Sequence, residues 1–121
     1  MNLPTATRAA VAALFIAACQ LAHAHAFPDH EAPGAGATVA TTQKDVAIDF
    51  DAAIEPAFSS ITVTDAQGKA VTSGKAVVDT SNRKHMSVGL IPLTPGVYTV
   101  AWVAVADDGH RTQGHYTFTA K

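Results

Sequence analysis

Histidine is the residue type best placed to do chemistry in this chain, which contains six histidines. If export removes residues 1–24, His25 becomes the first residue and carries a free α-amine. That amine and the imidazole ring can chelate one metal ion together. Copper(II) prefers nitrogen and oxygen donors in a tetragonal arrangement and binds most tightly of the divalent first-row metals. His25 is therefore a candidate copper ligand, although a histidine near a cleavage site can also have no role of its own.

Asp108-Gly109-His110 is the second candidate segment. It places a carboxylate and an imidazole two residues apart, where we expect a loop that closes the last hairpin. In such a loop, both groups can converge on one ion. The alternative is that Asp-Gly is ordinary turn chemistry and that His110 is simply solvated.

The other potential ligands give weaker signals. They are three histidines and three carboxylates: His30, His85, His115, Asp29, Asp51 and Glu55. Each of these histidines is more typical of a surface or strand edge than of a ligand, and the carboxylates are possible additional ligands. Met86 is the only methionine after residue 24. It argues against a methionine-rich copper(I) site, because copper(I) favours several soft thioether donors.

Several functional classes are excluded by what the exported chain lacks. Cys19, the only cysteine, lies in the segment expected to be removed, which excludes a blue-copper site, thiol catalysis and a cysteine-based zinc site. No Ser-His-Asp order, phosphate-binding glycine loop or paired carboxylate set indicates a hydrolase. Loss of Arg8 leaves seven basic and ten acidic residues, so nothing suggests a nucleic-acid surface or a basic membrane patch. We therefore expect a protein that is not an enzyme.

The N-terminal segment has the order of a secretory signal peptide. Arg8 is its only charge, and residues 9–18 form an unbroken apolar run that is short for a membrane span. Cleavage after Ala24 would leave His25 first, and cleavage after Ala26 would leave Phe27 first. A lipobox ending at Cys19 is a third possibility. We expect a signal peptide over residues 1–24 and one domain over residues 25–121.

The expected domain is all-β. Residues 46–50 and 61–64 alternate apolar and polar side chains, the period of a half-buried strand. Shorter strands are expected within 75–79 and 85–90, and longer ones within 97–105 and 114–119. Turn residues separate these segments, and residues 27–42 are expected to form an irregular arm. About seven short strands joined by turns indicate a β-sandwich or a small barrel, of the Ig-like or cupredoxin-like kind.

The C-terminal third contains a long motif. It consists of Thr94-Pro95-Gly96-Val97-Tyr98-Thr99-Val100-Ala101-Trp102, followed by residues 106–118 with Asp108-Gly109-His110. This motif resembles the C-terminal signature of the CopC-type copper resistance proteins. The spacing from His25 to Pro33 is similar to the family's mature N-terminal histidine and later proline. The resemblance implies a Greek-key β-barrel, a periplasmic location and copper(II) binding by His25, Asp108 and His110.

Two departures from the family pattern refine this expectation. Where many members carry glutamate after Phe-Ser, this chain has Phe50-Asp51-Ala52, so that carboxylate is absent or replaced by Asp51. The stretch 64–69, where some members have a methionine-rich copper(I) loop, contains no methionine. The resemblance therefore implies a member that binds only copper(II), and we expect a monomer that takes one such ion per chain. It also implies a possible partner, an inner-membrane copper transporter of the CopD type.

Three functions fit these features. The first is a periplasmic copper(II) carrier or buffer in copper homeostasis or resistance. The second is an oxidative enzyme of the histidine-brace kind, and the third is a metal-free Ig-like interaction module. Only the first two require His25 at a free N-terminus, and peroxide-dependent turnover would separate the second from the first.

Overall fold

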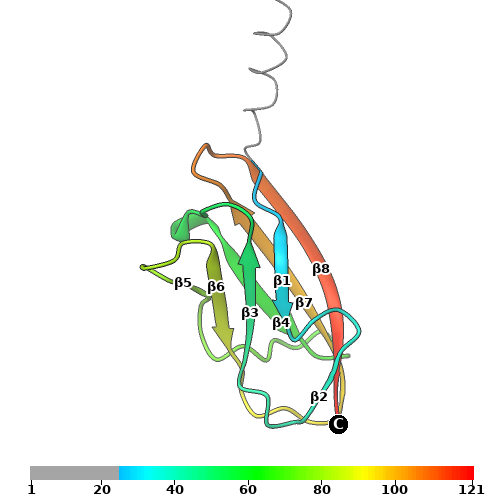
Figure 1. Cartoon of the computed structure of the whole chain (residues 1–121). Helices are drawn as coiled ribbons and strands as arrows, with labels where there is room; N and C mark the ends of the chain where they lie inside the picture. Colours follow the sequence, from blue (N-terminus) through cyan, green and yellow to red (C-terminus); the bar gives the residue numbers. More distant parts are fainter. Residues whose placement is uncertain (1–24) are drawn as a thin grey trace, which may run out of the picture.

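Two four-stranded sheets form the molecule over residues 25–121, which are the residues that the computed structural model describes (Figure 1). One sheet has the order β1-β3-β6-β5, with bounds Pro28–Ala32, Asp45–Phe50, His85–Gly89 and Val77–Val78. The other has the order β2-β8-β7-β4, with bounds Thr38–Val39, Arg111–Ala120, Gly96–Val105 and Ser60–Thr64. The signal peptide over residues 1–24 and the lipidation alternative at Cys19 lie outside the described residues.

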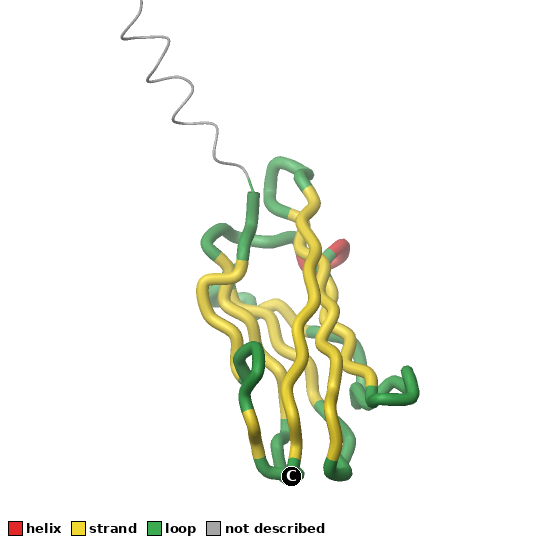
Figure 2. The backbone as a smooth tube through the Cα atoms, turned by 90° about the vertical axis from the view of Figure 1, so that its right-hand side faces the viewer, coloured by secondary structure: helices red, strands yellow, loops and turns green. Residues whose placement is uncertain are grey.

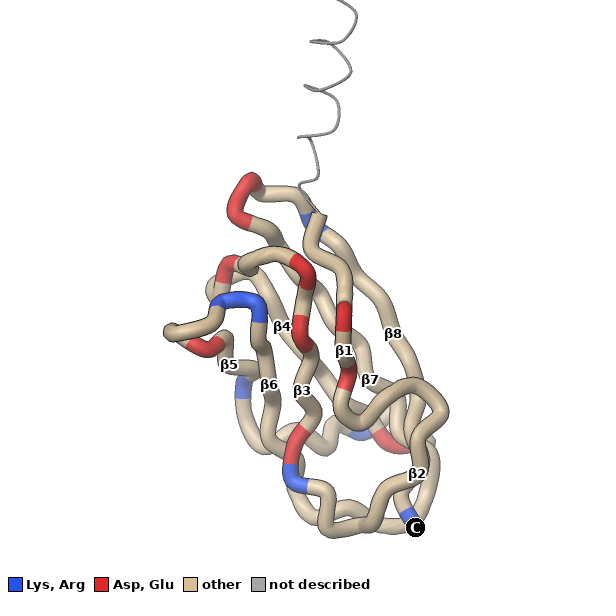
Figure 3. Tube along the Cα trace, in the orientation of Figure 1, with Lys and Arg blue, Asp and Glu red and all other residues tan. Residues whose placement is uncertain are grey.

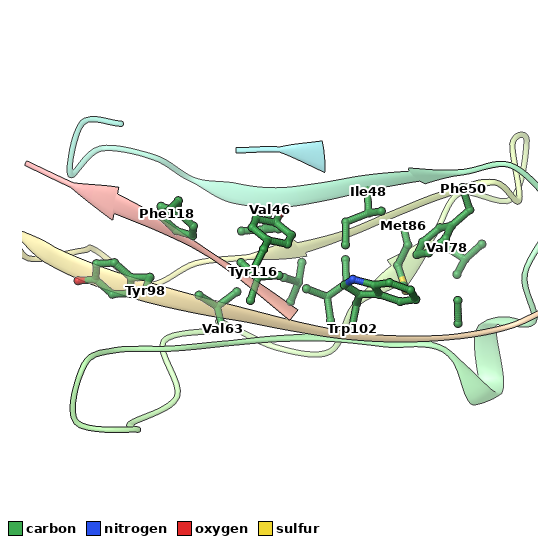
Figure 4. Close-up of a cluster of buried hydrophobic side chains, with 14 of the residues drawn as sticks. Val46, Ile48, Phe50, Val63, Val78, Met86, Tyr98, Trp102, Tyr116 and Phe118 are labelled. Carbon is green, nitrogen blue, oxygen red and sulfur yellow. The ribbon is translucent and has the colours of Figure 1, made fainter. Parts of the chain in front are cut away.

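The core lies between the two sheets and is built by alternation along the strands. In β3, Val46, Ile48 and Phe50 are buried while the residues between them are not. In β7, Tyr98, Val100 and Trp102 point inward in the same way. Figure 4 shows the labelled side chains of β3 and β7 meeting in one layer between the sheets, as expected when each sheet buries one face. Trp102 is buried and contributes the largest side chain of β7 to this core.

The all-β prediction is confirmed, and its sandwich form is the one observed. The two sheets pack face to face and are not closed into the barrel that the resemblance implied. Eight strands are present among the described residues, two of them only two residues long. The one helical segment in this range is the short 3-10 turn η1, Pro56–Phe58. No helix in the part of the chain that was searched is long and apolar enough to cross a membrane.

The prediction of an irregular arm over residues 27–42 is wrong in part. Pro28–Ala32 forms strand β1, antiparallel to β3, and Thr38–Val39 forms strand β2, parallel to β8. Neither strand shows apolar alternation, because both lie at sheet edges and are largely exposed. Their order comes from backbone hydrogen bonds to a neighbouring strand, and side-chain patterning does not reveal those bonds.

Strands β7 and β8 are the longest of the fold and form one hairpin. The loop of this hairpin contains the candidate ligands Asp108 and His110. Ten consecutive residue pairs join the strands, from Gly96 with Ala120 to Val105 with Arg111. The loop over residues 106–110 closes with the Ala106 N–H donating to the His110 carbonyl at 2.9 Å. Gly109 has φ of 87°, a left-handed conformation that glycine adopts without strain. Figure 2 shows loops gathered at the two ends of the sandwich, with this hairpin loop at one of them.

Candidate metal site

Asp108 and His110 form a closed unit in the hairpin loop. The His110 backbone N–H donates to Asp108 Oδ1 at 3.0 Å, and His110 Nδ1 lies 2.7 Å from Asp108 Oδ2. The His110 side chain is 59% exposed, so its other ring nitrogen remains accessible. A carboxylate on one ring nitrogen fixes the tautomer and orientation of a metal-binding histidine. The local geometry is therefore suited to presenting His110 Nε2 to an ion.

His25 lies against His110, although 85 positions separate the two in sequence. Their ring centroids are 4.9 Å apart and the ring planes meet at 66°. An ion about 2 Å from one nitrogen of each ring would lie about 3 Å from each centroid. Two rings at 4.9 Å can therefore hold one ion in neighbouring coordination positions. The Phe27 ring flanks this pair, with its centroid 6.1 Å from that of His25.

Two hydrogen-bonded anchors hold the N-terminal segment beside the hairpin. The Phe27 N–H donates to Asp51 Oδ1 at 2.8 Å, and the Asp51 N–H donates to the Phe27 carbonyl at 2.9 Å. Ala26 is fully buried, and its carbonyl accepts a hydrogen bond from the Thr112 hydroxyl of β8. These contacts lie one and two residues from His25, so they determine where that residue can reach.

Arg83 supports the hairpin loop from the opposite sheet. Its Nη2 atom contacts Asp107 Oδ1 at 2.6 Å, the Ile54 carbonyl at 3.0 Å and Glu55 Oε1 at 3.3 Å. Ile54 also forms an isolated bridge with Ala106 at the start of the loop. These contacts tie the residue before Asp108 to two other segments, although the ion pairs themselves are partly exposed.

The electrostatics favour a cation at this end of the molecule. Hydrogen bonds from the His110 backbone and then from its ring hold the pKa of Asp108 below its ordinary value. The proximity of His25 lowers that pKa further, by a smaller amount. Figure 3 shows acidic residues in the hairpin loop and in the nearby turns. Asp108 thus remains a carboxylate beside the two imidazole rings.

Whether the candidate site can hold a metal ion depends on a main-chain donor, the α-amine that His25 would carry after cleavage. Within residues 25–121, no group of three or more histidine, cysteine or acidic side chains stands ready to hold an ion. Cleavage after Ala24 would add the α-amine of His25 to the imidazoles of His25 and His110. Three nitrogens, with oxygen from Asp108 or water, match the preference of copper(II).

The remaining sequence candidates do not join this cluster. Met86 is fully buried in the core, and His115 lies in the middle of β8, five residues beyond His110. Glu55 pairs with Arg83, and Asp29 lies in β1. His30 and His85 lie on the other sheet, where His85 contacts Asp49.

Sequence reasoning missed two residues that shape the site, Arg83 and Thr112. Thr112 gave a faint signal, because it is a polar residue at an inward position of an alternating strand. Arg83 gave none, because its partners are 24 to 29 residues away.

The fold and the loop cluster define a small β-sandwich protein with two histidines, distant in sequence, paired at one end. A family model described as the CopC domain matches residues 29–121. The chain therefore belongs to the CopC family. It is 35% identical over 99 residues to protein YobA of Escherichia coli K12, a match that covers 81% of this chain and 80% of that protein.

Two solved structures share the fold. CopC from Methylosinus trichosporium OB3b superposes with a TM-score of 0.75 at 32% identity, covering 80% of this chain and 94% of that one. PcoC, a methionine-rich copper resistance protein from Escherichia coli, gives a TM-score of 0.68 at 30% identity. That match covers 81% of this chain and all of the PcoC chain. The resemblance first noted in residues 94–118 thus extends over the whole described domain.

Proposed function

We propose that this protein binds one copper(II) ion per chain in the periplasm and acts as a carrier or buffer in copper homeostasis, without catalysing a reaction. The ion is held by the α-amine and imidazole of His25 and by the imidazole of His110. Asp108 completes the site. An inner-membrane copper transporter of the CopD type is the expected recipient of the ion.

The observation that carries this proposal is the pairing of His25 with His110. The chain places two imidazoles from opposite ends of the domain 4.9 Å apart, and buried or paired backbone groups anchor the segments that carry them. The donor set is rich in nitrogen, residues 25–121 contain no cysteine, and Met86, the only methionine among them, is buried; this favours copper(II) over copper(I). The similarity to PcoC, a copper resistance protein of Escherichia coli, supports copper as the ion.

Asp108 acts on the ion mainly through His110. Both of its oxygens contact His110, one at the backbone N–H and one at Nδ1. This contact leaves Nε2 free for the ion and places a negative charge beside it. Asp108 also becomes a direct oxygen ligand if the ion displaces one of these hydrogen bonds.

The test compares copper(II) affinity in four forms of the mature protein. The reference form begins at His25, the second carries one extra serine before it, and the other two carry His110→Ala or His115→Ala. The added serine turns the α-amine into an amide, so we expect at least tenfold weaker binding, about 1.4 kcal/mol. His110→Ala should weaken binding similarly, and His115→Ala should not. Full affinity in the extended form would exclude His25 as the anchor.

The location and the maturation site are tested by intact mass. Protein recovered from the periplasm should have the mass of residues 25–121. A lipidated Cys19, or a chain that starts at Phe27, would remove the N-terminal ligand and contradict the proposal.

A further inference from the structure

Three polar side chains form a row across the outer face of the sheet β1-β3-β6. His30 of β1 pairs with Asp49 of β3, and Asp49 pairs in turn with His85 of β6. Directly opposite residues in antiparallel strands project to the same face, with Cβ atoms about 5 Å apart. The strand neighbours Ile48 and Met86 are fully buried, so the row faces solvent. This face is separate from the hairpin loop and takes no part in the proposed function.

The centre of the row is already formed. His85 Nδ1 lies 2.6 Å from Asp49 Oδ1, and the two side chains are 35% and 40% exposed. An ion that displaces the proton between these two atoms would be held by both of them, because adjacent nitrogen and oxygen ligands of one ion lie close to this distance apart. An exposed pair of this kind contributes little to stability. The fold therefore does not require a histidine at this position.

Small side chains beside the row leave room for the imidazole rings. The next residues on the same face are Ala32, Ala47 and Ser87, which pair with one another across the three strands. On the outer flank, the Asp79 N–H donates to the His85 carbonyl at 2.9 Å, which adds another acidic residue. Figure 3 shows acidic residues along β1 and β3. The surroundings are therefore open and favourable to a cation.

We infer that His30, Asp49 and His85 form a second, weaker site for a divalent transition-metal ion, bound most tightly as copper(II). The outer strands of the row are two strand spacings apart, about 10 Å. Imidazoles rising from both sides can hold an ion over the central carboxylate, and imidazole and carboxylate suit copper(II). Because no group of three such side chains within residues 25–121 already stands ready to hold an ion, binding requires the exposed His30 ring to turn toward Asp49. Ordering that ring on binding makes this site weaker than the site at His25.

The experiment is a copper(II) titration of the mature protein by calorimetry and EPR. The same titration is repeated on a form in which an extra N-terminal serine and His110→Ala disable the first site. We expect two equivalents in the former and one weak equivalent in the latter. His30→Asn and His85→Asn should each weaken the second equivalent at least tenfold and leave the first unchanged. His115→Asn, which changes a histidine on the other sheet, is the matched control.

Two results of the titrations overturn the inference. One is the absence of a second equivalent from the otherwise folded protein. The other is equal loss of the second equivalent in the His115→Asn control, which would indicate unspecific binding to surface histidines. Amide signals of residues 47–49 and 85–87 should broaden on addition of the second equivalent, and broadening confined elsewhere would also exclude the row. Failure of the first site in the extended form does not affect these readouts, so the two proposals are tested separately.

Discussion

Asp51 connects the N-terminal segment to the rest of the protein. From the sequence it was a possible replacement for the glutamate that many relatives carry at the position of Ala52. In the structure, one of its carboxylate oxygens accepts the Phe27 N–H, two residues from His25. Its backbone also donates to the Phe27 carbonyl. We therefore interpret Asp51 as a positioning residue that holds His25 near His110.

Replacing Asp51 should separate a positioning role from a ligand role. Asp51→Ala removes one hydrogen bond, worth about 1 kcal/mol or about fivefold in copper(II) affinity. The EPR spectrum of the bound ion should stay the same, because the donor atoms do not change. Asp51→Asn retains an oxygen that can accept the Phe27 N–H, so it should bind like the wild type. A changed spectrum, together with equal loss in the asparagine variant, would instead identify Asp51 as a ligand.

Tyr116 should make the stability of the domain sensitive to alkaline pH. Its hydroxyl donates to the Pro33 carbonyl at 2.8 Å, and burial, with a smaller effect of Glu31, raises its pKa well above the ordinary 10.0. The unfolded chain therefore loses this proton at lower pH than the folded one. The stability due to Tyr116 is complete below pH 10 and is lost progressively as pH rises above that value.

Urea unfolding at pH 8 and pH 11 tests this effect. At pH 8, Tyr116→Phe should be less stable than the wild type by about 1 kcal/mol, because the Pro33 carbonyl loses its donor. At pH 11 the difference should shrink by about 1 kcal/mol, since one pKa unit corresponds to about 1.4 kcal/mol. An unchanged difference between the two pH values would show that the folded and unfolded states titrate alike at this residue.

In the β7–β8 hairpin, the large side chain of Trp102 packs directly against a glycine, Gly114, which has no side chain. Trp102 of β7 pairs directly with Gly114 of β8, and its ring packs edge-on to Phe50 of the facing sheet. A Cβ atom at Gly114 would lie 2.7 Å from the Trp102 ring, which is too close for two carbon atoms. Glycine inside a strand often marks such a close approach. The glycine therefore lets the tryptophan reach the core.

Gly114→Ala should destabilise the domain by about 1 to 3 kcal/mol, the usual cost of overpacking a core. Gly34→Ala is the matched control, because its added Cβ would meet a neighbouring atom at 3.5 Å, an ordinary contact. Thermal unfolding of both variants, followed by circular dichroism, measures the difference. Equal stability of the two variants would mean that Trp102 shifts without cost.

At the level of elements, the sequence predicted the strands that bury a face and missed those that do not. Residues 97–105 alternate strongly and form nearly all of β7, whereas β1 is an exposed edge strand without a pattern. The residues of the candidate site divide in the same way, into those with a sequence signal and those without one. His25, Asp108 and His110 were proposed from spacing and family resemblance, and they stay a prediction. Arg83 and Thr112 were not, because the contacts they make depend on how distant segments pack.

Over the whole molecule, the candidate site joins the beginning of the domain to its last hairpin. Chain termini are commonly disordered unless contacts tie them down. The structure instead shows Ala26 and Phe27 already bonded to Thr112 and Asp51. In the proposed site, copper(II) would therefore have only His25 left to order, and the stability that it adds would come mainly from its preference for the folded state.

Copper(II) should raise the melting temperature of the protein that begins at His25. A ligand specific to the folded state adds about 2.7 kcal/mol at a hundredfold excess over its dissociation constant. For a domain of this size, that amount corresponds to roughly 10 °C or more. Scanning calorimetry with and without copper(II), and after removal of the ion by a chelator, measures the shift. One extra residue before His25 should abolish most of it while leaving the melting temperature of the apo form unchanged, because Ala26 and Phe27 keep their anchors. If the extended form shows the same shift, the stabilising ion binds elsewhere and the N-terminal amine has no part in it.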